Sequence, residues 1–125
     1  MKYTDDGSLP EVTEQDLFAA QARFKPFTVI ILKHGPNYPA AGPRSDPDVF
    51  ATIVRHGRRN ASLRLAGLLR VVCPVNDGSD VAGVGVFDAT PEDVERIYSR
   101  DPAIKAGILT YEVHATQTFP DSCLS

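Results

Sequence analysis

The chain has 125 residues, of which 42% are hydrophobic and 23% are charged, so its composition is that of one ordinary folded domain. Thirteen basic and sixteen acidic residues give a formal net charge of −3, which disfavours nucleic acid as the main partner. The longest apolar run is far shorter than the ~20 residues of a membrane span. The acidic start at residues 1–6 does not resemble a signal peptide. We therefore expect a cytoplasmic protein.

The two cysteines, Cys73 and Cys123, show neither the paired spacing of a zinc site nor a disulfide framework. The sequence also lacks the glycine fingerprint of dinucleotide-binding proteins, the Walker phosphate-binding loop and the common serine and zinc hydrolase motifs. We therefore predict neither a metal nor an organic cofactor.

The N-terminal part of the chain, residues 1–26, is predicted to be an extension with one short helix, because Thr13 and Asp16 have the spacing of a capping box. Residues 27–33 are β-branched and nearly all apolar, which predicts a central strand buried on both faces. Residues 35–43 contain three prolines and two glycines, so they form a long loop, which could act as a lid.

A long helix is predicted from Ser45, as its N-cap, to about Gly67, because apolar residues recur at steps of three and four. Gly57 within this helix marks a place where another backbone could approach closely. The remaining predicted elements are two strands of a hairpin, a second helix and a last strand, at residues 68–75, 82–88, 90–100 and 108–119.

The predicted order β-α-β-β-α-β is typical of the α+β ferredoxin-like fold, in which an antiparallel sheet carries both helices on one side. Residues 27–119 would form this domain, and residues 120–125 would be a C-terminal tail. Because the first strand is apolar on both faces, a partner has to cover the open face of the sheet. We expect this partner to be a second copy of the chain, in a homodimer.

Four features of the sequence recur together in one known family. They are His56 in the first long helix, residues 65–69 before the hairpin, Cys73-Pro74 where the family usually has Gly-Pro, and Asp-Pro-Ala-Ile-Lys-Ala-Gly at 101–107. The last motif is the most specific. On these residues the chain resembles the YCII-related (YciI-like) family of the dimeric α/β-barrel superfamily.

The resemblance covers residues 27–119. In that family two ferredoxin-like subunits pack sheet to sheet, and a helical His forms an acid/base pair with the Asp of the Asp-Pro motif. The resemblance therefore implies a homodimer and a catalytic pair of His56 and Asp101. The N-terminal extension, the loop 35–43 and Cys73 depart from the family pattern, so no relative's substrate is carried over.

Further residues are predicted to bind the substrate. Arg59 lies three residues after His56 in a locally positive stretch of helix, and we predict that it contacts an anionic group. Tyr38 in the loop and His34 at the end of the first strand would border the same cleft. A His beside a carboxylate can take up and deliver a proton near neutral pH, which is the chemistry that this cleft would need.

Glu112 and His114 form a second polar cluster, because alternate residues of a strand share one face of the sheet. Together with His34 they could bind a metal. No further ligand stands at a suitable spacing, so a polar network at the dimer interface is favoured over a metal site.

These observations favour a small cofactor-independent enzyme that moves protons on a small anionic, phenolic or enolisable substrate. Isomerisation, elimination of the dehydrochlorinase type and dehydration all fit, because each removes one proton and delivers another. Two alternatives stay open at this stage. One is a non-catalytic dimer that binds a metabolite or serves as an accessory subunit, and the other is a cofactor-free quinol-type monooxygenase.

Overall fold

The structure is a computed structural model that describes residues 7, 9–121 and 124. The acidic start at 1–6 and Cys123 lie outside the described residues. The chain divides into two compact units, a smaller one from residues 1–25 and 118–125 and a larger one from residues 26–117.

The smaller unit contains α1 (Glu14–Gln21), which confirms the short helix expected in the N-terminal part. Its first turn is closed by the predicted capping box. The side chain of Thr13 accepts a hydrogen bond from the backbone N–H of Asp16 at 3.0 Å, and the Asp16 carboxylate accepts one from the N–H of Thr13 at 3.3 Å. Phe24 and Phe119 pack edge to face in this unit, with ring centres 4.6 Å apart.

Among the described residues, the sheet has four strands in the order β2-β3-β1-β4. They are β1 (Lys25–His34), β2 (Leu69–Pro74), β3 (Val81–Phe87) and β4 (Leu109–Thr118). β3 runs antiparallel to both β1 and β2, and β1 lies inside the sheet as expected. The strand order and the intervening helices confirm the predicted α+β ferredoxin-like arrangement.

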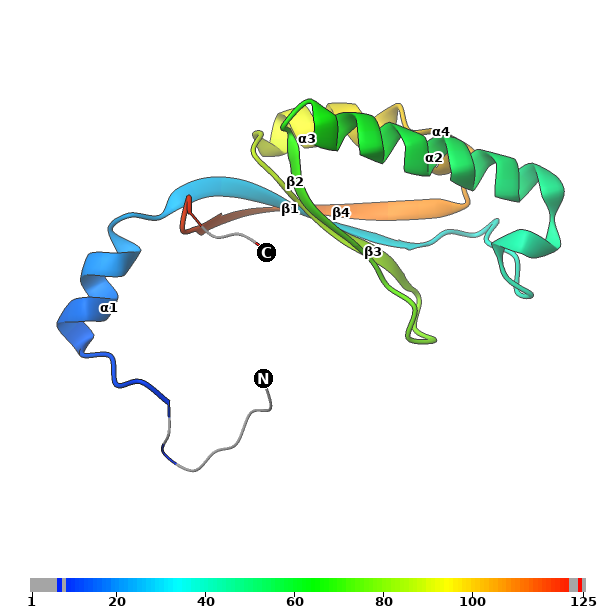
Figure 1. The fold of residues 1–125 in the computed structure, drawn as a ribbon. Helices are drawn as coiled ribbons and strands as arrows, with labels where there is room; N and C mark the ends of the chain where they lie inside the picture. The colour runs from blue at the N-terminus through cyan, green and yellow to red at the C-terminus, as the bar shows by residue number, and fades with distance from the viewer. Residues whose placement is uncertain (1–6, 8, 122–123, 125) are drawn as a thin grey trace. The chain divides into compact units, whose positions relative to one another are not determined.

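The α-helices of the larger unit lie together on one side of the sheet (Figure 1). They are α2 (Pro47–Leu65), α3 (Pro91–Ser99) and α4 (Pro102–Lys105), and the short 3₁₀ helix η1 (Pro43–Ser45) precedes α2. The one-turn helix α4 was not expected after an Asp-Pro pair. It forms because proline suits the first position of a helix, and the preceding aspartate caps it.

Two local predictions about α2 were wrong. Its N-cap is Asp46, whose carboxylate accepts the N–H of Asp48 at 2.9 Å, whereas Ser45 belongs to η1. Pro47 occupies the first helical position, which makes its predecessor the cap. The second wrong prediction is the close approach of another backbone at Gly57. A Cβ placed there would have nothing within 4 Å.

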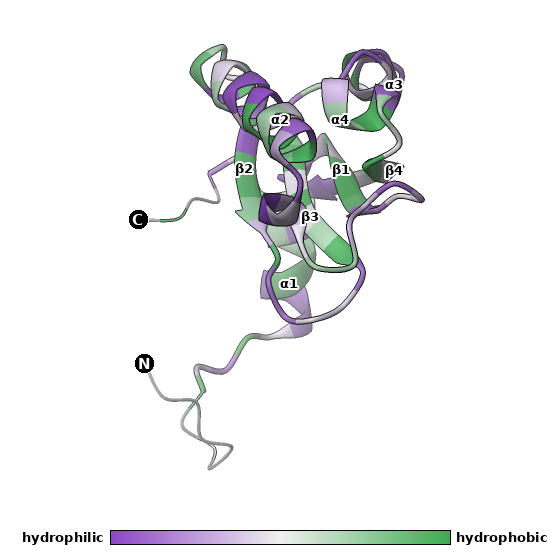
Figure 2. Cartoon of the chain, turned by 90° about the vertical axis from the view of Figure 1, so that its right-hand side faces the viewer, coloured by the Kyte–Doolittle hydropathy of each residue, from purple (hydrophilic) through white to green (hydrophobic). Residues whose placement is uncertain are grey.

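The core lies between the helices and one face of the sheet. Side chains of β1 alternate, so that Thr28, Ile30 and Leu32 are buried on the helix side while Val29 and Ile31 are only half-buried. Within this chain, β1 is therefore buried on its helix side, and the predicted burial of its other face under a partner stays a prediction. Figure 2 shows hydrophobic residues along the strands and on the helices above them.

Candidate functional site

The structure brings His56 and Asp101 into contact. His56 lies in the middle of α2, Asp101 directly precedes α4, and these two helices pack against each other. Nδ1 of His56 lies 3.0 Å from both carboxylate oxygens of Asp101. The Asp101 side chain is fully buried, and that of His56 is 11% exposed. The contact is therefore shielded from water on the Asp101 side.

The carboxylate of Asp101 is held by backbone donors as well as by the imidazole. Its Oδ2 accepts the N–H of Ala103 at 3.0 Å and that of Ile104 at 3.3 Å, as the N-cap of α4. Nη1 of Arg59 lies 3.8 Å from its Oδ1. A buried carboxylate needs such donors in place of the water that it loses. The Asp-Pro motif thus both starts a helix and fixes an acceptor against His56.

The second ring nitrogen of His56 also has a partner. Nδ2 of Asn60, one helical turn further along α2, lies 3.3 Å from Nε2 of His56. The hydroxyl of Tyr98 on α3 donates to Oδ1 of Asn60 at 3.1 Å. Sequence reasoning missed both residues as part of the site. The signal for Asn60 was its spacing of four from His56, whereas Tyr98 read only as a core residue of its helix.

Burial strongly raises the pKa of the Tyr98 phenol, and the negative charge of Asp101 raises it further, whereas Arg59 acts in the opposite direction. The phenol therefore stays protonated at physiological pH. Its hydroxyl has the buried oxygen of Asn60 as its acceptor, which orients the amide of that side chain.

A cleft of about 270 Å³ opens beside His56. Its polar side chains are His56, Asn60 and Tyr38, and no charged side chain of the described residues lines it. Most of the wall is apolar and comes from α2 and from all four strands, including Leu32, Ile53, Val72, Ala82 and Leu109. The cleft thus places one titratable imidazole in an apolar surrounding, as in many sites for small molecules.

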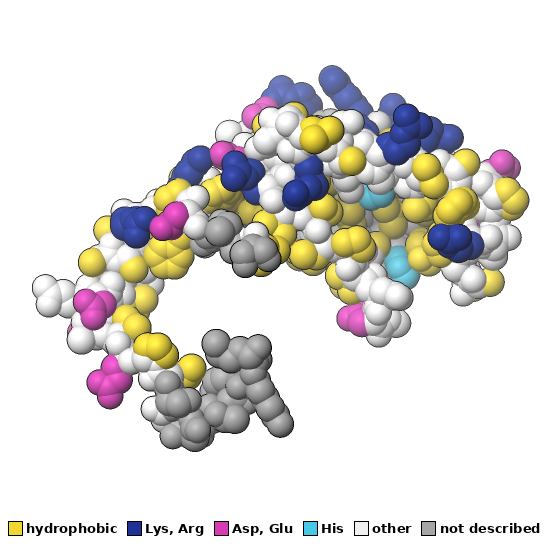
Figure 3. All heavy atoms as spheres, viewed as in Figure 1, with side chains coloured by type: hydrophobic (Ala, Val, Ile, Leu, Met, Phe, Trp, Pro, Cys, Tyr) yellow, Lys and Arg dark blue, Asp and Glu magenta, His cyan; other side chains and the backbone are white. Residues whose placement is uncertain are grey.

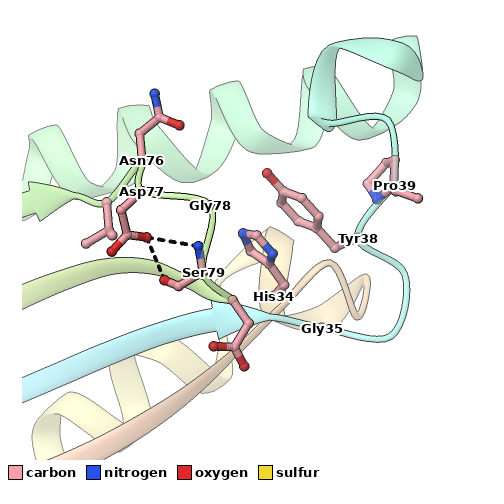
Figure 4. Close-up of a pocket in the computed structure, with 11 residues that line it drawn as sticks. His34, Gly35, Tyr38, Pro39, Asn76, Asp77, Gly78 and Ser79 are labelled. Carbon is pink, nitrogen blue, oxygen red and sulfur yellow. Dashed lines mark hydrogen bonds between the residues drawn. The ribbon is translucent and has the colours of Figure 1, made fainter.

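A separate depression of about 500 Å³ lies between the end of β1, the proline-rich loop and the β2–β3 hairpin (Figure 4). The rings of His34 and Tyr38 stack there, with centres 3.7 Å apart and planes inclined by 5°. Tyr38 lines both this depression and the cleft beside His56, but His34 lines only the depression. The structure therefore places Tyr38, and not His34, at the predicted cleft.

Arg59 does not line the cleft beside His56, in contrast to the prediction. A residue three positions further along a helix is displaced by about 60° around its axis. This displacement turns Arg59 towards α3, where it lines another depression, of about 260 Å³, with Arg96 and Arg100. Figure 3 shows many Lys and Arg side chains over the helical layer. Arg59 thus contacts Asp101 and lines the depression beside α3.

Glu112 and His114 lie on the exposed face of β4, and their side chains approach to 3.3 Å. The neighbour of Glu112 on β1 is Lys33, at 3.0 Å, in place of His34. The hydrogen bond from Lys33 lowers the pKa of Glu112, with a smaller effect of His114. In the described part of the chain, no three His, Cys, Asp or Glu side chains are grouped as metal ligands.

No protein-family model matches this sequence, and no curated protein matches it. The YCII-related family therefore stays a prediction. Among solved structures, the chain is similar to 5-chloro-2-hydroxyhydroquinone dehydrochlorinase from Burkholderia phenoliruptrix in complex with 2,5-dihydroxybenzoquinone, with a TM-score of 0.46 and 19% identity. The match covers 70% of this chain and 90% of that chain. No helix among the described residues is long and apolar enough to cross a membrane.

Proposed function

We propose that the protein is a cofactor-independent enzyme that transfers protons on a small, uncharged substrate, with His56 and Asp101 as its acid/base pair. The observation that carries the proposal is the contact of 3.0 Å between the buried Asp101 carboxylate and Nδ1 of an imidazole that lines a cleft. A carboxylate in this position orients the ring and stabilises the imidazolium that forms when the ring takes up a proton.

The lining of the cleft narrows the class of substrate. Because no charged side chain of the described residues lines the cleft, a carboxylated substrate would lose its hydration without gaining a partner. A phenol or an enolisable ketone has an acidic proton on an otherwise apolar body and fits this lining. A cavity of roughly 150 Å³ holds a benzene molecule, so a cleft of about 270 Å³ has room for one substituted ring.

Three reaction types fit the pair. His56 would remove a proton from carbon or oxygen, and the imidazolium would return it at a second position in an isomerisation, or to a leaving group in an elimination or a dehydration. An acid/base residue of this kind contributes about 10²- to 10⁴-fold in rate. The pair therefore supports proton transfer in general, and the substrate decides which of the three reactions follows.

Deuterium exchange tests the proposal without knowledge of the physiological reaction. A panel of small cyclic ketones and substituted hydroquinones is incubated with the protein in D₂O, and incorporation of deuterium at carbon is followed by NMR. We expect exchange of at least one panel member, and a loss of about 10²-fold or more in His56→Gln and Asp101→Asn. Arg58→Gln is the matched control, because Arg58 is exposed on the same helix and lines no part of the cleft.

Two results would contradict the proposal. One is exchange that persists at the wild-type rate in the His56→Gln, Asp101→Asn double variant. The other is a panel member that binds in the cleft, as shown by shifts in the NMR signals of the cleft residues, but whose acidic C–H protons never exchange. The latter result would favour the non-catalytic binding protein.

We also propose that the open face of the sheet pairs with a second copy of the chain. Val29 and Val86 are cross-strand partners, as are Ile31 and Val84, and all four side chains are half-buried on the face opposite the helices. Val71 is the partner of Val86 on β2 and extends the same apolar surface. Apolar side chains on adjacent strands are typical of a sheet face that a partner covers.

A further inference from the structure

Four buried side chains form one hydrogen-bonded chain: Tyr98 on α3, Asn60 and His56 on α2, and Asp101, the N-cap of α4. Tyr98 is 1% exposed, His56 and Asn60 are each 9% exposed, and Asp101 is fully buried. The links measure 3.1 Å from Tyr98 to Asn60, 3.3 Å from Asn60 to His56 and 3.0 Å from His56 to Asp101. Both nitrogens of the imidazole therefore face a group that restricts where its protons can be.

The donors and acceptors of this chain can be assigned from its two ends. A phenol that stays protonated donates its hydrogen to Oδ1 of Asn60, which leaves the NH₂ end of the amide towards His56. An amide NH₂ can only donate, so Nε2 of His56 has to accept and carries no proton. At the other end the Asp101 carboxylate can only accept, so Nδ1 of His56 carries the proton.

We propose that Asn60, oriented by the hydroxyl of Tyr98, is a positioning residue that holds the His56 ring with its proton on Nδ1 and its Nε2 lone pair free of a proton, as the acceptor of the Asn60 amide. The proposal deepens the proposed function and rests on it for the identity of the group that uses this lone pair. His56 and Asn60 line the cleft, whereas Asp101 does not, so Nε2 is the nitrogen on the cleft side. The pair then acts first as a base.

The charged groups near His56 are the carboxylate of Asp101 before α4, 3.0 Å from Nδ1, and Arg59 on α2, whose Nη1 lies 3.8 Å from Oδ1 of Asp101. Among the described residues, Tyr98 on α3, Tyr38 in the loop after β1 and Cys73 on β2 are the other titratable groups near the ring or its cleft. The group that contacts Nε2 itself is the amide of Asn60.

The length of the link from Asn60 to His56 suits a temporary partner. At 3.3 Å it is longer than the usual 2.9–3.0 Å of such a hydrogen bond, so an acidic hydrogen of a bound substrate can replace it. Once Nε2 has taken up this proton, it can no longer accept from the amide. The amide of Asn60 then has no acceptor on the ring. This loss favours transfer of the proton from the ring to the product.

The test reads the protons on His56 directly and needs no substrate. In the ¹⁵N-labelled full chain, two-bond ¹H–¹⁵N correlations distinguish a ring nitrogen that carries hydrogen from one that does not, and His34→Gln and His114→Gln identify the signals of His56. We expect His56 at near-neutral pH to show an unprotonated Nε2 and a protonated Nδ1. Asn60→Asp replaces the donor by an acceptor, so we expect Nε2 to become protonated at the same pH.

Tyr98→Phe leaves the amide free to turn its oxygen towards Nε2, so we expect a larger protonated fraction of His56 than in the wild type. Tyr111→Phe is the matched control, because its hydroxyl bonds Glu95 and has no part in the chain of four. It should leave the His56 signals unchanged. A wild-type His56 protonated on both nitrogens or on Nε2 alone would overturn the inference, as would unchanged charge of His56 in Asn60→Asp. A failed deuterium-exchange assay with the expected NMR pattern would count against the proposed function alone.

Discussion

The carboxylate of Asp101 lies 3.0 Å from Nδ1 of His56, although 45 residues separate them in the sequence. The same carboxylate accepts two backbone N–H groups at the start of α4. The Asp101 side chain therefore holds the end of the preceding loop, caps α4 and orients the imidazole of His56. Substitutions of Asp101 can separate the contribution of the cap from that of the imidazole contact.

Asp101→Asn and Asp101→Ala should differ in stability. An asparagine is also a good N-cap, so we expect the Asn variant to lose only about 1 kcal/mol of the free energy of unfolding. The Ala variant loses the cap and leaves His56, Ala103 and Ile104 without their acceptor, so we expect a loss of about 3 kcal/mol. Urea unfolding at neutral pH measures both values. Equal losses in the two variants would show that the cap contributes nothing.

Two glycine-to-alanine substitutions should act in opposite directions. A Cβ on Gly35 would clash with the carbonyl oxygen of Gly107, where the end of β1 meets the start of β4. The atoms of Gly107 and Ile108 that this Cβ would meet are all backbone and cannot turn aside, so we expect Gly35→Ala to lose about 2–4 kcal/mol of stability. A Cβ on Gly57 would have nothing within 4 Å, and alanine is the better helix former, so we expect Gly57→Ala to gain up to about 1 kcal/mol. Thermal unfolding of both variants checks the prediction, which a gain in Gly35→Ala would contradict.

Stability should fall at alkaline pH in part through Tyr98. Burial raises the pKa of Tyr98 in the folded protein, whereas the pKa of an unfolded tyrosine is about 10. Above that pH the unfolded chain loses the phenolic proton while the folded chain keeps it, so the free energy of unfolding decreases as pH rises. The Tyr98→Phe variant has no phenolic proton to lose in either the folded or the unfolded chain. We expect the variant to be about 1 kcal/mol less stable at neutral pH, through the lost hydrogen bond to Asn60, but to show a shallower alkaline decline.

The alkaline prediction is measured as urea midpoints of the two proteins from neutral pH to above pH 10. The informative quantity is the difference between the wild type and Tyr98→Phe, because all other titrating groups are common to both. A difference that stays constant over the whole range would mean that Tyr98 titrates alike in the folded and unfolded chains.

A charge in the middle of the open sheet face should prevent association. Ile31→Lys places an ammonium on β1 beside Val84, its cross-strand partner, in the surface that we propose to pair with a second copy. We expect the wild type to have twice the chain mass in size-exclusion chromatography with light scattering, and Ile31→Lys to have the mass of one chain. Val54→Lys is the control, because Val54 is already 42% exposed on α2. A wild-type mass of one chain at high concentration would contradict the proposed dimer.

Local signals in the sequence determined most of the elements. Thr90 caps α3, and the Asp77-Gly78 pair forms the hairpin turn with a φ of +82° at Gly78, as the residue types require. Such patterns act over a few residues, so they can be read without the fold. The N-cap of α2 was misplaced by one residue, and α4 was missed, because several polar residues beside a proline offer competing starts for a helix.

The site depended on contacts that only the tertiary structure decides. The sequence suggested His56 and Asp101 through a family resemblance, but their contact arises from the packing of α2 against α4. The spacing of Asn60 from His56 does not distinguish it from any other polar residue on a helix face. In the same way, the sequence does not distinguish Tyr98 from an ordinary core residue of its helix. The sequence also did not show that Arg59 lines a depression beside α3, because the direction of a side chain around a helix axis gains meaning only when the neighbouring helices are placed. Residue spacing fixes which side chains share a face, and packing fixes what that face meets.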